Sequence, residues 1–309
     1  MTAMSVAILF SGQGKQTATM GADLYAEDGN YRQVIDAANQ QLNWDLTAPL
    51  DVQDPQRVPV AIAAMSLGIY AALQPSLPQP AALLGLSLGE YSALMAAKAF
   101  SMTDGLKLVA DRARYMQRAS VMNPGMLVAA LKVTPALVAQ ACQAGQAVGQ
   151  AYPANYNLAD QVVIGGDVRG VRAAMASLTA QGVKRLVPLQ VSAASHTPLM
   201  APASTALAQR LTHLTVRTPQ LPVWSNTTVT PFTATTLKAT LVDQLVQPTH
   251  FYADLQALAQ RGVETFIQVG PGSDLAKFAK KAVPTARVMN VATSEDLAAV
   301  RTNLKAVTR

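Results

Sequence analysis

The chain has 309 residues and a net charge of +6; half of its residues are hydrophobic and 14% are charged. This length and composition favour one large domain with an insertion, or two domains, and argue against extensive disorder. Aromatic residues make up only 5%, and no dense run of lysine or arginine is present, which argues against a nucleic-acid-binding surface. The positive charge therefore indicates either a solvated surface or a dock for an acidic protein or a phosphorylated ligand.

Cysteine content and apolar runs indicate the compartment. Cys142 is the only cysteine, which rules out an internal disulfide and suits a reducing environment. It lies in an Ala/Gln-rich stretch, residues 138–150, where we expect a structural role at a helix end. The apolar run 6–10 is too short for a signal peptide, and the run 58–73 is shorter than the roughly 20 residues of a membrane span. We therefore expect a cytoplasmic protein with no membrane partner.

The first and last parts of the chain alternate short apolar runs with helical patterns. Before residue 122, we predict strands at 6–10 and 81–85, and helices at 58–74, 90–99 and 104–120, the last capped by Thr103. After His196, we predict helices at 198–211 and 254–260 and strands at 222–225 and 265–269. Such alternation predicts a parallel sheet with helices on its faces.

A different pattern separates these two parts. Following the turn Asn123-Pro124-Gly125, we predict in order a strand at 126–133, a helix opening at Thr134-Pro135, strands at 151–157 and 161–165, a helix at 168–181 and a strand at 184–191. The order βαββαβ is typical of a ferredoxin-like unit. We therefore predict an α/β fold with a parallel-sheet core, residues 1–122 and 197–309, and an inserted ferredoxin-like small domain, residues 123–196.

The segment Gly85-Leu86-Ser87-Leu88-Gly89 fits the G-x-S-x-G pattern of a nucleophile elbow. In an elbow the serine lies on a sharp, strained turn from strand to helix, and side chains two residues to either side would collide. A predicted strand precedes Ser87, and the helix that follows would direct its N-terminus at the negative charge that develops during acyl transfer. The pattern in this context points to Ser87 as a nucleophile; a structural glycine-rich turn is the alternative.

A serine nucleophile needs a base, and the chain has three histidines. His213 lies late in a predicted helix and is interpreted as a surface residue, whereas His250 precedes Phe251 at a predicted helix start and is interpreted as structural. His196 lies in a loop of small residues that leads from the small domain back to the large one. Such a loop allows a histidine to reach into a cleft, so His196 is the candidate base, with a structural role as the alternative.

Seven segments in the same order resemble motifs of the malonyl-CoA:acyl carrier protein transacylases, stand-alone enzymes of fatty acid synthesis. They are FSGQGKQ at 10–16, GLSLGEYSA at 85–93, RARYMQ at 112–117, NYNLADQVVIGG at 155–166, SHTPLM at 195–200, QLVQP at 244–248 and QVGPG at 268–272. The resemblance implies a hydrolase-like α/β core with a ferredoxin-like small domain and an active site between them.

The resemblance also implies catalytic roles. Ser87 would be the nucleophile and His196 the general base and acid. The backbone carbonyl of Gln244, rather than an aspartate, would orient the histidine. The backbone N–H groups of Gln13 and Leu88 would form the oxyanion hole.

The implied substrate is a malonyl group. Arg112, by itself a solvated helix residue, matches the family arginine that would hold the malonyl carboxylate through two parallel hydrogen bonds. Asn155 and Gln161 on the small domain would contact pantetheine or line the cleft. Malonyl would pass from coenzyme A to Ser87 and then to acyl carrier protein, an acidic partner that suits the charge of +6. No metal or cofactor is implied, since malonyl-CoA is a substrate, and we expect a monomer.

Leu86 departs from the family pattern, which has histidine before the nucleophile. We expect Ser87 and His196 to keep their catalytic roles, whereas the effect of Leu86 on the rate and on the acyl preference stays open. A serine thioesterase or hydrolase, and a polyketide-type acyltransferase with another acyl preference, remain alternatives, as does a non-catalytic scaffold. A nucleotide-binding protein is disfavoured, because G-x-G-x-x-G fails at Thr17 and Lys15 is followed by Gln16 rather than serine or threonine.

Overall fold

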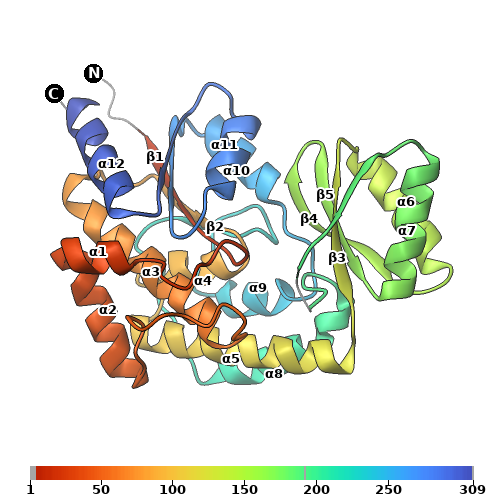
Figure 1. Ribbon diagram of the computed structural model, residues 1–309, viewed down its shortest axis with the longest axis horizontal. Helices are drawn as coiled ribbons and strands as arrows, with labels where there is room; N and C mark the ends of the chain where they lie inside the picture. The colour runs from red at the N-terminus through yellow and green to blue at the C-terminus, as the bar shows by residue number, and fades with distance from the viewer. Residues whose placement is uncertain (1–4, 191–192, 308–309) are drawn as a thin grey trace.

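Two β-sheets organise the structure, a computed structural model that describes residues 5–190 and 193–307 (Figure 1). The larger sheet has five parallel strands in the order β7-β2-β1-β8-β9. The smaller sheet has four antiparallel strands in the order β4-β5-β3-β6. The small sheet and its two helices stand beside the rest of the molecule (Figure 1).

The larger sheet is built around a fully buried central strand. Its strands are β1 (Val6–Phe10), β2 (Ala82–Gly85), β7 (Val223–Trp224), β8 (Thr265–Val269) and β9 (Arg287–Val291). Parallel strands covered on both faces consist of nearly continuous apolar residues, which explains the short apolar runs in the sequence. Because all five strands are parallel, their carboxyl ends meet at one edge, the usual place for a site in such sheets.

Helices cover both faces of the larger sheet. They are α1 (Ala22–Glu27), α2 (Gly29–Leu42), α3 (Arg57–Leu73), α4 (Leu88–Ala96), α5 (Met102–Met122), α8 (Ala201–Thr212), α9 (Leu237–Asp243), α10 (Phe251–Gln260), α11 (Asp274–Ala282) and α12 (Ser294–Val307). Alternate residues of β1 serve the two faces: Ile8 and Phe10 pack in the core with α3 and α4, whereas Leu9 packs in the core with α10 and α11. Within the described residues, α3 with the turn after it, Arg57–Ser76, is the one helix long and apolar enough to cross a membrane, and it lies in the protein core.

The small sheet has the topology of a ferredoxin-like unit. Its strands are β3 (Met126–Leu131), β4 (Ala151–Leu158), β5 (Gln161–Gly166) and β6 (Arg185–Pro188), and its helices are α6 (Pro135–Gln146) and α7 (Val168–Ala180). The two helices pack on the sheet through one apolar cluster. Cys142 of α6 is buried in that cluster, where burial raises the pKa of its thiol to about 12. The predicted fold class is confirmed; the exact domain limits stay a prediction.

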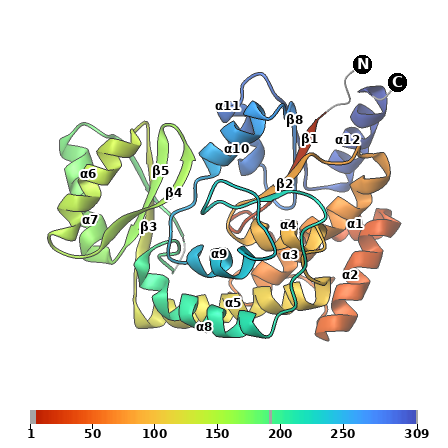
Figure 2. The same cartoon turned by 180° about the vertical axis from the view of Figure 1, so that it is seen from behind.

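Thr249 joins the two parts of the structure. It follows α9 and adds a short parallel bridge to β4: Tyr156 donates its N–H to the Thr249 carbonyl (2.8 Å), and Thr249 donates its N–H to the Ala154 carbonyl (3.0 Å). The ring of Tyr156 also stacks on His250, with ring centres 5.0 Å apart. The junction fixes the segment after α9, which begins at Gln244. Figure 2 shows α9 beside the small sheet.

Several predicted boundaries were wrong. Ser101, not Thr103, caps α5, because its Oγ accepts the N–H of Asp104 at 3.0 Å. The helix predicted at 90–99 spans Leu88–Ala96, and that predicted at 198–211 is divided into a 3₁₀ turn (Pro198–Met200) and α8. The predicted strand 184–191 is Arg185–Pro188, and its predicted end at Val191 lies outside the described residues. The sequence analysis also missed α1, α2, α9, α11, β9 and α12.

Candidate active site

Ser87 occupies a strained turn between β2 and α4. Its backbone has φ 53° and ψ −98°, in the region of positive φ that favours glycine. A Cβ at Gly85 would lie 1.9 Å from the carbonyl carbon of Gly89, and a Cβ at Gly89 would lie 2.1 Å from the carbonyl oxygen of Phe10. Both glycines are therefore required by the close approach of β1, β2 and α4. The turn exposes Ser87 at the N-terminus of α4.

Ser87 is hydrogen bonded to the histidine predicted as its base. Its Oγ lies 2.9 Å from Nε2 of His196, and Nδ1 of His196 lies 2.7 Å from the backbone carbonyl oxygen of Gln244. Because a carbonyl only accepts, Nδ1 carries the proton, and Nε2 is free to accept the serine proton. The N–H of His196 also donates to the Leu245 carbonyl at 3.0 Å, so the same segment holds both backbone and ring.

His196 is kept in its neutral form. Its side chain is 3% exposed, and burial, aided by the positive charge of Arg112, lowers its pKa to about 4. Desolvation disfavours the imidazolium, and so does a nearby cation. A neutral imidazole at neutral pH is the form that accepts a proton from serine.

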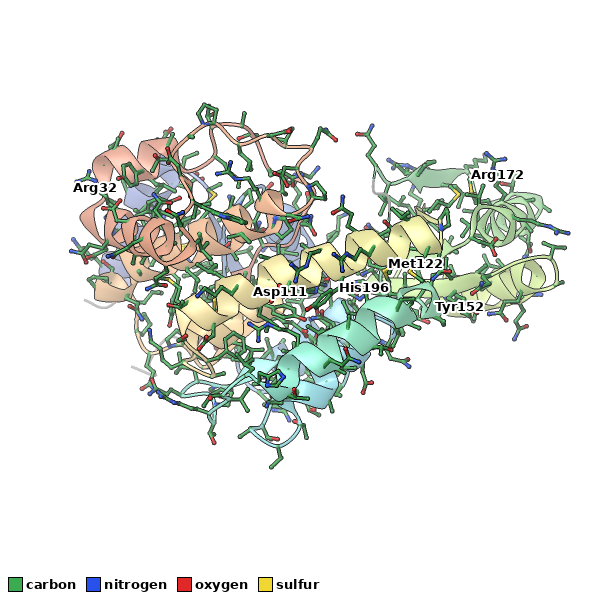
Figure 3. All side chains as sticks on the ribbon, turned by 90° about the horizontal axis from the view of Figure 1, so that it is seen from below. Arg32, Asp111, Met122, Tyr152, Arg172 and His196 are labelled. Atoms are coloured by element: carbon green, nitrogen blue, oxygen red, sulfur yellow. The ribbon has the colours of Figure 1, made fainter. Side chains whose placement is uncertain are left out.

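Arg112 lies beside the same serine. It projects from α5, is 2% exposed, and donates through one terminal nitrogen to Ser87 Oγ (3.0 Å) and to Gln244 Oε1 (3.3 Å). Its guanidinium is 5.2 Å from the ring centre of Tyr91. Within the described residues its Nε has no hydrogen-bond partner. Figure 3 looks onto α5 and α8, with His196 seen between them. A buried guanidinium with a free donor next to a nucleophile is suited to holding a carboxylate.

Two buried side chains hold the backbone of Ser87: that of Asn226, which the sequence analysis did not assign, and that of Gln244, for which it assigned a role only to the backbone carbonyl. Asn226 accepts the N–H of Ser87 through Oδ1 at 2.9 Å and donates its own N–H to Glu90. Gln244 donates through Nε2 to the carbonyl of Ser87 at 3.0 Å and also to Glu90. Burial raises the pKa of Glu90 to about 8, against the opposing effects of these two donors and of Arg112.

A second buried carboxyl group, that of Asp254, contacts Asn226. Asp254 on α10 accepts a hydrogen bond from Nδ2 of Asn226 at 2.9 Å, and burial raises its pKa well above the usual range. A positional signal for Asn226 was available in the sequence: it follows the predicted strand 222–225, and carboxyl ends of parallel strands share one edge. Glu90 directly follows the elbow segment Gly85–Gly89, but nothing local shows that its side chain is buried.

The loop after β1 lies against the elbow. A Cβ at Gly12 would be 2.9 Å from the Leu86 carbonyl oxygen, and Ser11 accepts a hydrogen bond from Nε2 of Gln268 at 2.9 Å. In the part of the chain that the structure describes, no acceptor is found for the backbone N–H of Gln13 or of Leu88. Both predicted oxyanion-hole donors are therefore free to bind a ligand.

Asn155 and Gln161 are not part of this cluster. Asn155 donates through Nδ2 to Oγ1 of Thr249 at 2.7 Å, at the junction of the two sheets. Gln161 begins β5 and lies about 13 Å along the strand from Gly165, which faces Thr197 beside the histidine. Their roles toward pantetheine stay predictions.

The other residues weighed in the sequence have the positions expected of structural groups. His213 is exposed at the end of α8, and His250 precedes α10. Lys15 forms an exposed ion pair with Asp274 at 3.6 Å. Across residues 5–190 and 193–307, no three His, Cys, Asp or Glu side chains are grouped so that they could hold a metal ion.

Comparison with known proteins identifies the family of the chain. Residues 8–306 match the acyl transferase domain family. The chain is 35% identical over 289 residues to the malonyl CoA-acyl carrier protein transacylase of Escherichia coli (strain K12). The matched region covers 90% of this chain and 93% of that protein.

Two solved structures are similar over nearly their full length. The crystal structure of MCAT from Streptococcus pneumoniae gives a TM-score of 0.93 at 36% identity, covering 97% of this chain and 100% of that one. A malonyl-transacylase in complex with its type II PKS acyl-carrier protein (PlMCAT:AntF) gives 0.91 at 30% identity, covering 97% and 99%. The chain belongs to the acyl transferase domain family and, within it, to the malonyl-CoA:acyl carrier protein transacylases.

Proposed function

We propose that this chain transfers a malonyl group from malonyl-CoA to the phosphopantetheine thiol of acyl carrier protein, through an ester on Ser87. One observation carries the proposal: the guanidinium of Arg112 lies 3.0 Å from Ser87 Oγ. A single site thus combines an activated serine with a cation that can hold an acyl group ending in a carboxylate. The names of the relatives support the same activity.

In the first half-reaction, Nε2 of His196 takes the proton of Ser87 as Oγ attacks the thioester carbonyl of malonyl-CoA. The N–H groups of Gln13 and Leu88 stabilise the resulting oxyanion. The intermediate collapses, the C–S bond breaks, and the leaving sulfur of coenzyme A receives the proton from His196. Loss of one such oxyanion donor slows acyl transfer about 10²–10³-fold.

In the second half-reaction, the phosphopantetheine thiol gives its proton to His196 and its sulfur attacks the ester carbonyl on Ser87. Collapse breaks the bond to Oγ, and His196 returns the proton to the serine. The carbonyl of Gln244 keeps the imidazole in one tautomer through both halves, since it holds the Nδ1 proton. No acidic third residue is needed for this.

Arg112 provides the acyl preference. A malonyl group carries its carboxylate one methylene from the reacting carbonyl, so a cation that recognises it must lie beside the nucleophile. A charged hydrogen bond contributes about 1.5–3 kcal/mol, which favours malonyl over acetyl by roughly one to two powers of ten.

The partner is acyl carrier protein, and the expected setting is fatty acid biosynthesis in the cytoplasm. Support comes from the relatives and from the similar structure that holds an acyl-carrier protein. The net charge of +6 suits an acidic partner. Asn155 and Gln161 are proposed to contact pantetheine or line the cleft, Asn155 by exchanging its bond to Thr249.

The test is intact mass after brief incubation with malonyl-CoA, acetyl-CoA or methylmalonyl-CoA. The wild type should gain one malonyl group, Ser87→Ala should gain none, and Cys142→Ser, which removes the only thiol, should behave as the wild type. Comparing turnover to water with turnover to acyl carrier protein separates a transferase from a thioesterase. An adduct that persists in Ser87→Ala, or none from any donor, would contradict the proposal.

A further inference from the structure

One buried carboxyl group, that of Glu90, is hydrogen bonded to both residues that hold the backbone of Ser87, Asn226 and Gln244. Glu90 lies in the first turn of α4, three residues after the serine, and has no exposed surface. One of its oxygens accepts the N–H of Asn226, and the other accepts Nε2 of Gln244. Both contacts come from distant parts of the chain, so they are not part of the helix that carries Glu90.

Through these two partners Glu90 fixes both sides of the serine backbone. Asn226 accepts the N–H of Ser87 at 2.9 Å, and Gln244 donates to its carbonyl at 3.0 Å. The φ of 53° at Ser87 is unfavourable for a residue with a side chain and persists only where its surroundings determine it. The strained elbow is thus held by a frame with Glu90 at its centre.

The same frame also orients the general base, His196. Gln244 uses its side chain for Glu90 and Ser87, and its backbone carbonyl for Nδ1 of His196 at 2.7 Å. A shift of Gln244 therefore moves the nucleophile and the base together.

The frame also reaches Arg112. In the described residues Arg112 forms no ion pair, but it donates to Oε1 of Gln244, whose Nε2 donates to Glu90. Both oxygens of Glu90 face N–H donors and no acceptor for an acid proton, so this geometry favours the carboxylate form, although burial raises the pKa to about 8. The amide of Gln244 therefore lies between the guanidinium of Arg112 and the carboxyl group of Glu90.

We propose that Glu90 is a positioning residue that sets the mutual placement of Ser87, His196 and Arg112 through Asn226 and Gln244, without touching the substrate. This inference rests on the proposed function for the identity of the acyl donor, but the positioning itself does not depend on that donor.

Glu90→Gln tests the frame, since the new amide directs an N–H at one of two donors. The probe is a fluorophosphonate, whose phosphorus Ser87 Oγ attacks with loss of fluoride while His196 takes the proton. Its labelling rate by intact mass reports the Ser–His geometry for any acyl donor. Misplacement of reacting groups by about 1 Å costs roughly a hundredfold, which is the slowing expected.

A charge swap separates positioning from simple loss of stability. In Glu90→Gln/Gln244→Glu, the new amide at position 90 can donate to the new carboxylate at position 244, which also accepts from Arg112 but no longer donates to the Ser87 carbonyl. Gln244→Glu alone lacks the same donor, so the swap should label about tenfold faster than Gln244→Glu, a coupling typical of residues in one network. If Glu90→Gln does not fold, the comparison of the swap with Gln244→Glu decides.

Asp28→Asn is the matched control. Asp28 is a largely buried carboxylate that accepts the N–H of Tyr31 at 2.9 Å and pairs with Arg301 at 2.7 Å, away from the frame. It should lower the melting temperature and leave the labelling rate unchanged. The inference is overturned if Glu90→Gln labels at the wild-type rate, or if the swap is no faster than Gln244→Glu. A wild type that labels but takes no malonyl would contradict the proposed function alone.

Discussion

Arg112 and Ser87 share a hydrogen bond of 3.0 Å, although Arg112 lies on α5 and Ser87 in the turn between β2 and α4. The oxygen that would carry the acyl group is therefore in contact with the cation that would select it. A malonyl carboxylate lies one methylene from the carbonyl that Ser87 attacks, so this contact has the reach that a malonyl ester requires.

Replacing Arg112 should abolish the preference for malonyl. Arg112→Ala is expected to reduce acylation by malonyl-CoA about 10–100-fold while acylation by acetyl-CoA changes little, because the loss of one charged hydrogen-bonded contact costs about 1.5–3 kcal/mol. Arg112→Lys should recover only part of the preference, since an ammonium cannot form two parallel bonds. Rapid-quench mass spectrometry with both donors gives the ratio.

The control for this change is Arg114→Ala. Arg114 lies on the same helix and pairs with Asp111 at 2.6 Å, and its side chain is exposed. Its removal should leave the malonyl-to-acetyl ratio unchanged; an equal loss in both variants would mean that net charge, rather than the contact with Ser87, sets the preference.

The fall in labelling rate at low pH, the acid limb of the pH profile, should report the protonation of His196. The neutral imidazole is the active form, and burial together with Arg112 lowers its pKa to about 4. Fluorophosphonate labelling should therefore be constant above about pH 5 and fall as His196 gains a proton near pH 4. Arg112→Ala removes a cation, which raises this pKa and moves the limb to higher pH. A wild-type midpoint at the ordinary histidine value of about 6.5 would contradict the buried, neutral state.

The elbow glycines should tolerate no side chain. Gly89→Ala places a Cβ 2.1 Å from the backbone oxygen of Phe10, an overlap that we expect to cost ~3 kcal/mol of unfolding free energy or more. Gly29→Ala is the matched change, since nothing lies within 4 Å of its Cβ and it begins α2. That control should be neutral or slightly stabilising. Urea unfolding of both variants measures the difference; similar stabilities would mean that the turn is less tightly packed than described.

Leu86 should affect rate rather than reaction type. Its side chain is partly buried against the core that contains Leu9 and Trp224. Leu86→His, which restores the residue usual in the family, is expected to cost about 1 kcal/mol of stability, half the value for a fully buried leucine. The same acyl-enzyme should form on Ser87 by intact mass. A change from an inactive protein to an active one would show that Leu86 blocks the wild-type site.

Local sequence patterns predicted the elements with simple periodicity or glycine geometry. The strands Val6–Phe10 and Thr265–Val269 were predicted to the residue, because fully buried parallel strands are nearly continuous apolar runs, broken in the second only by Thr265 and Gln268. The helices α1, α2, α9, α11 and α12 were missed. Three of them, α1, α9 and α11, have 6, 7 and 9 residues, and tertiary packing rather than local propensity stabilises helices this short.

The sequence by itself predicted the elbow at Ser87, His196 as the candidate base among three histidines, and the βαββαβ order of the small unit, since each prediction rests on local geometry or on residue count. The carbonyl that holds His196 was expected only from the family resemblance, and the tertiary structure alone showed that Glu90 is buried beneath the serine rather than solvated on its helix. Those contacts join residues separated by 48 positions for His196 and Gln244 and by 154 for Glu90 and Gln244. Their partners are set by how the two sheets and α9 pack, and no local propensity encodes such packing.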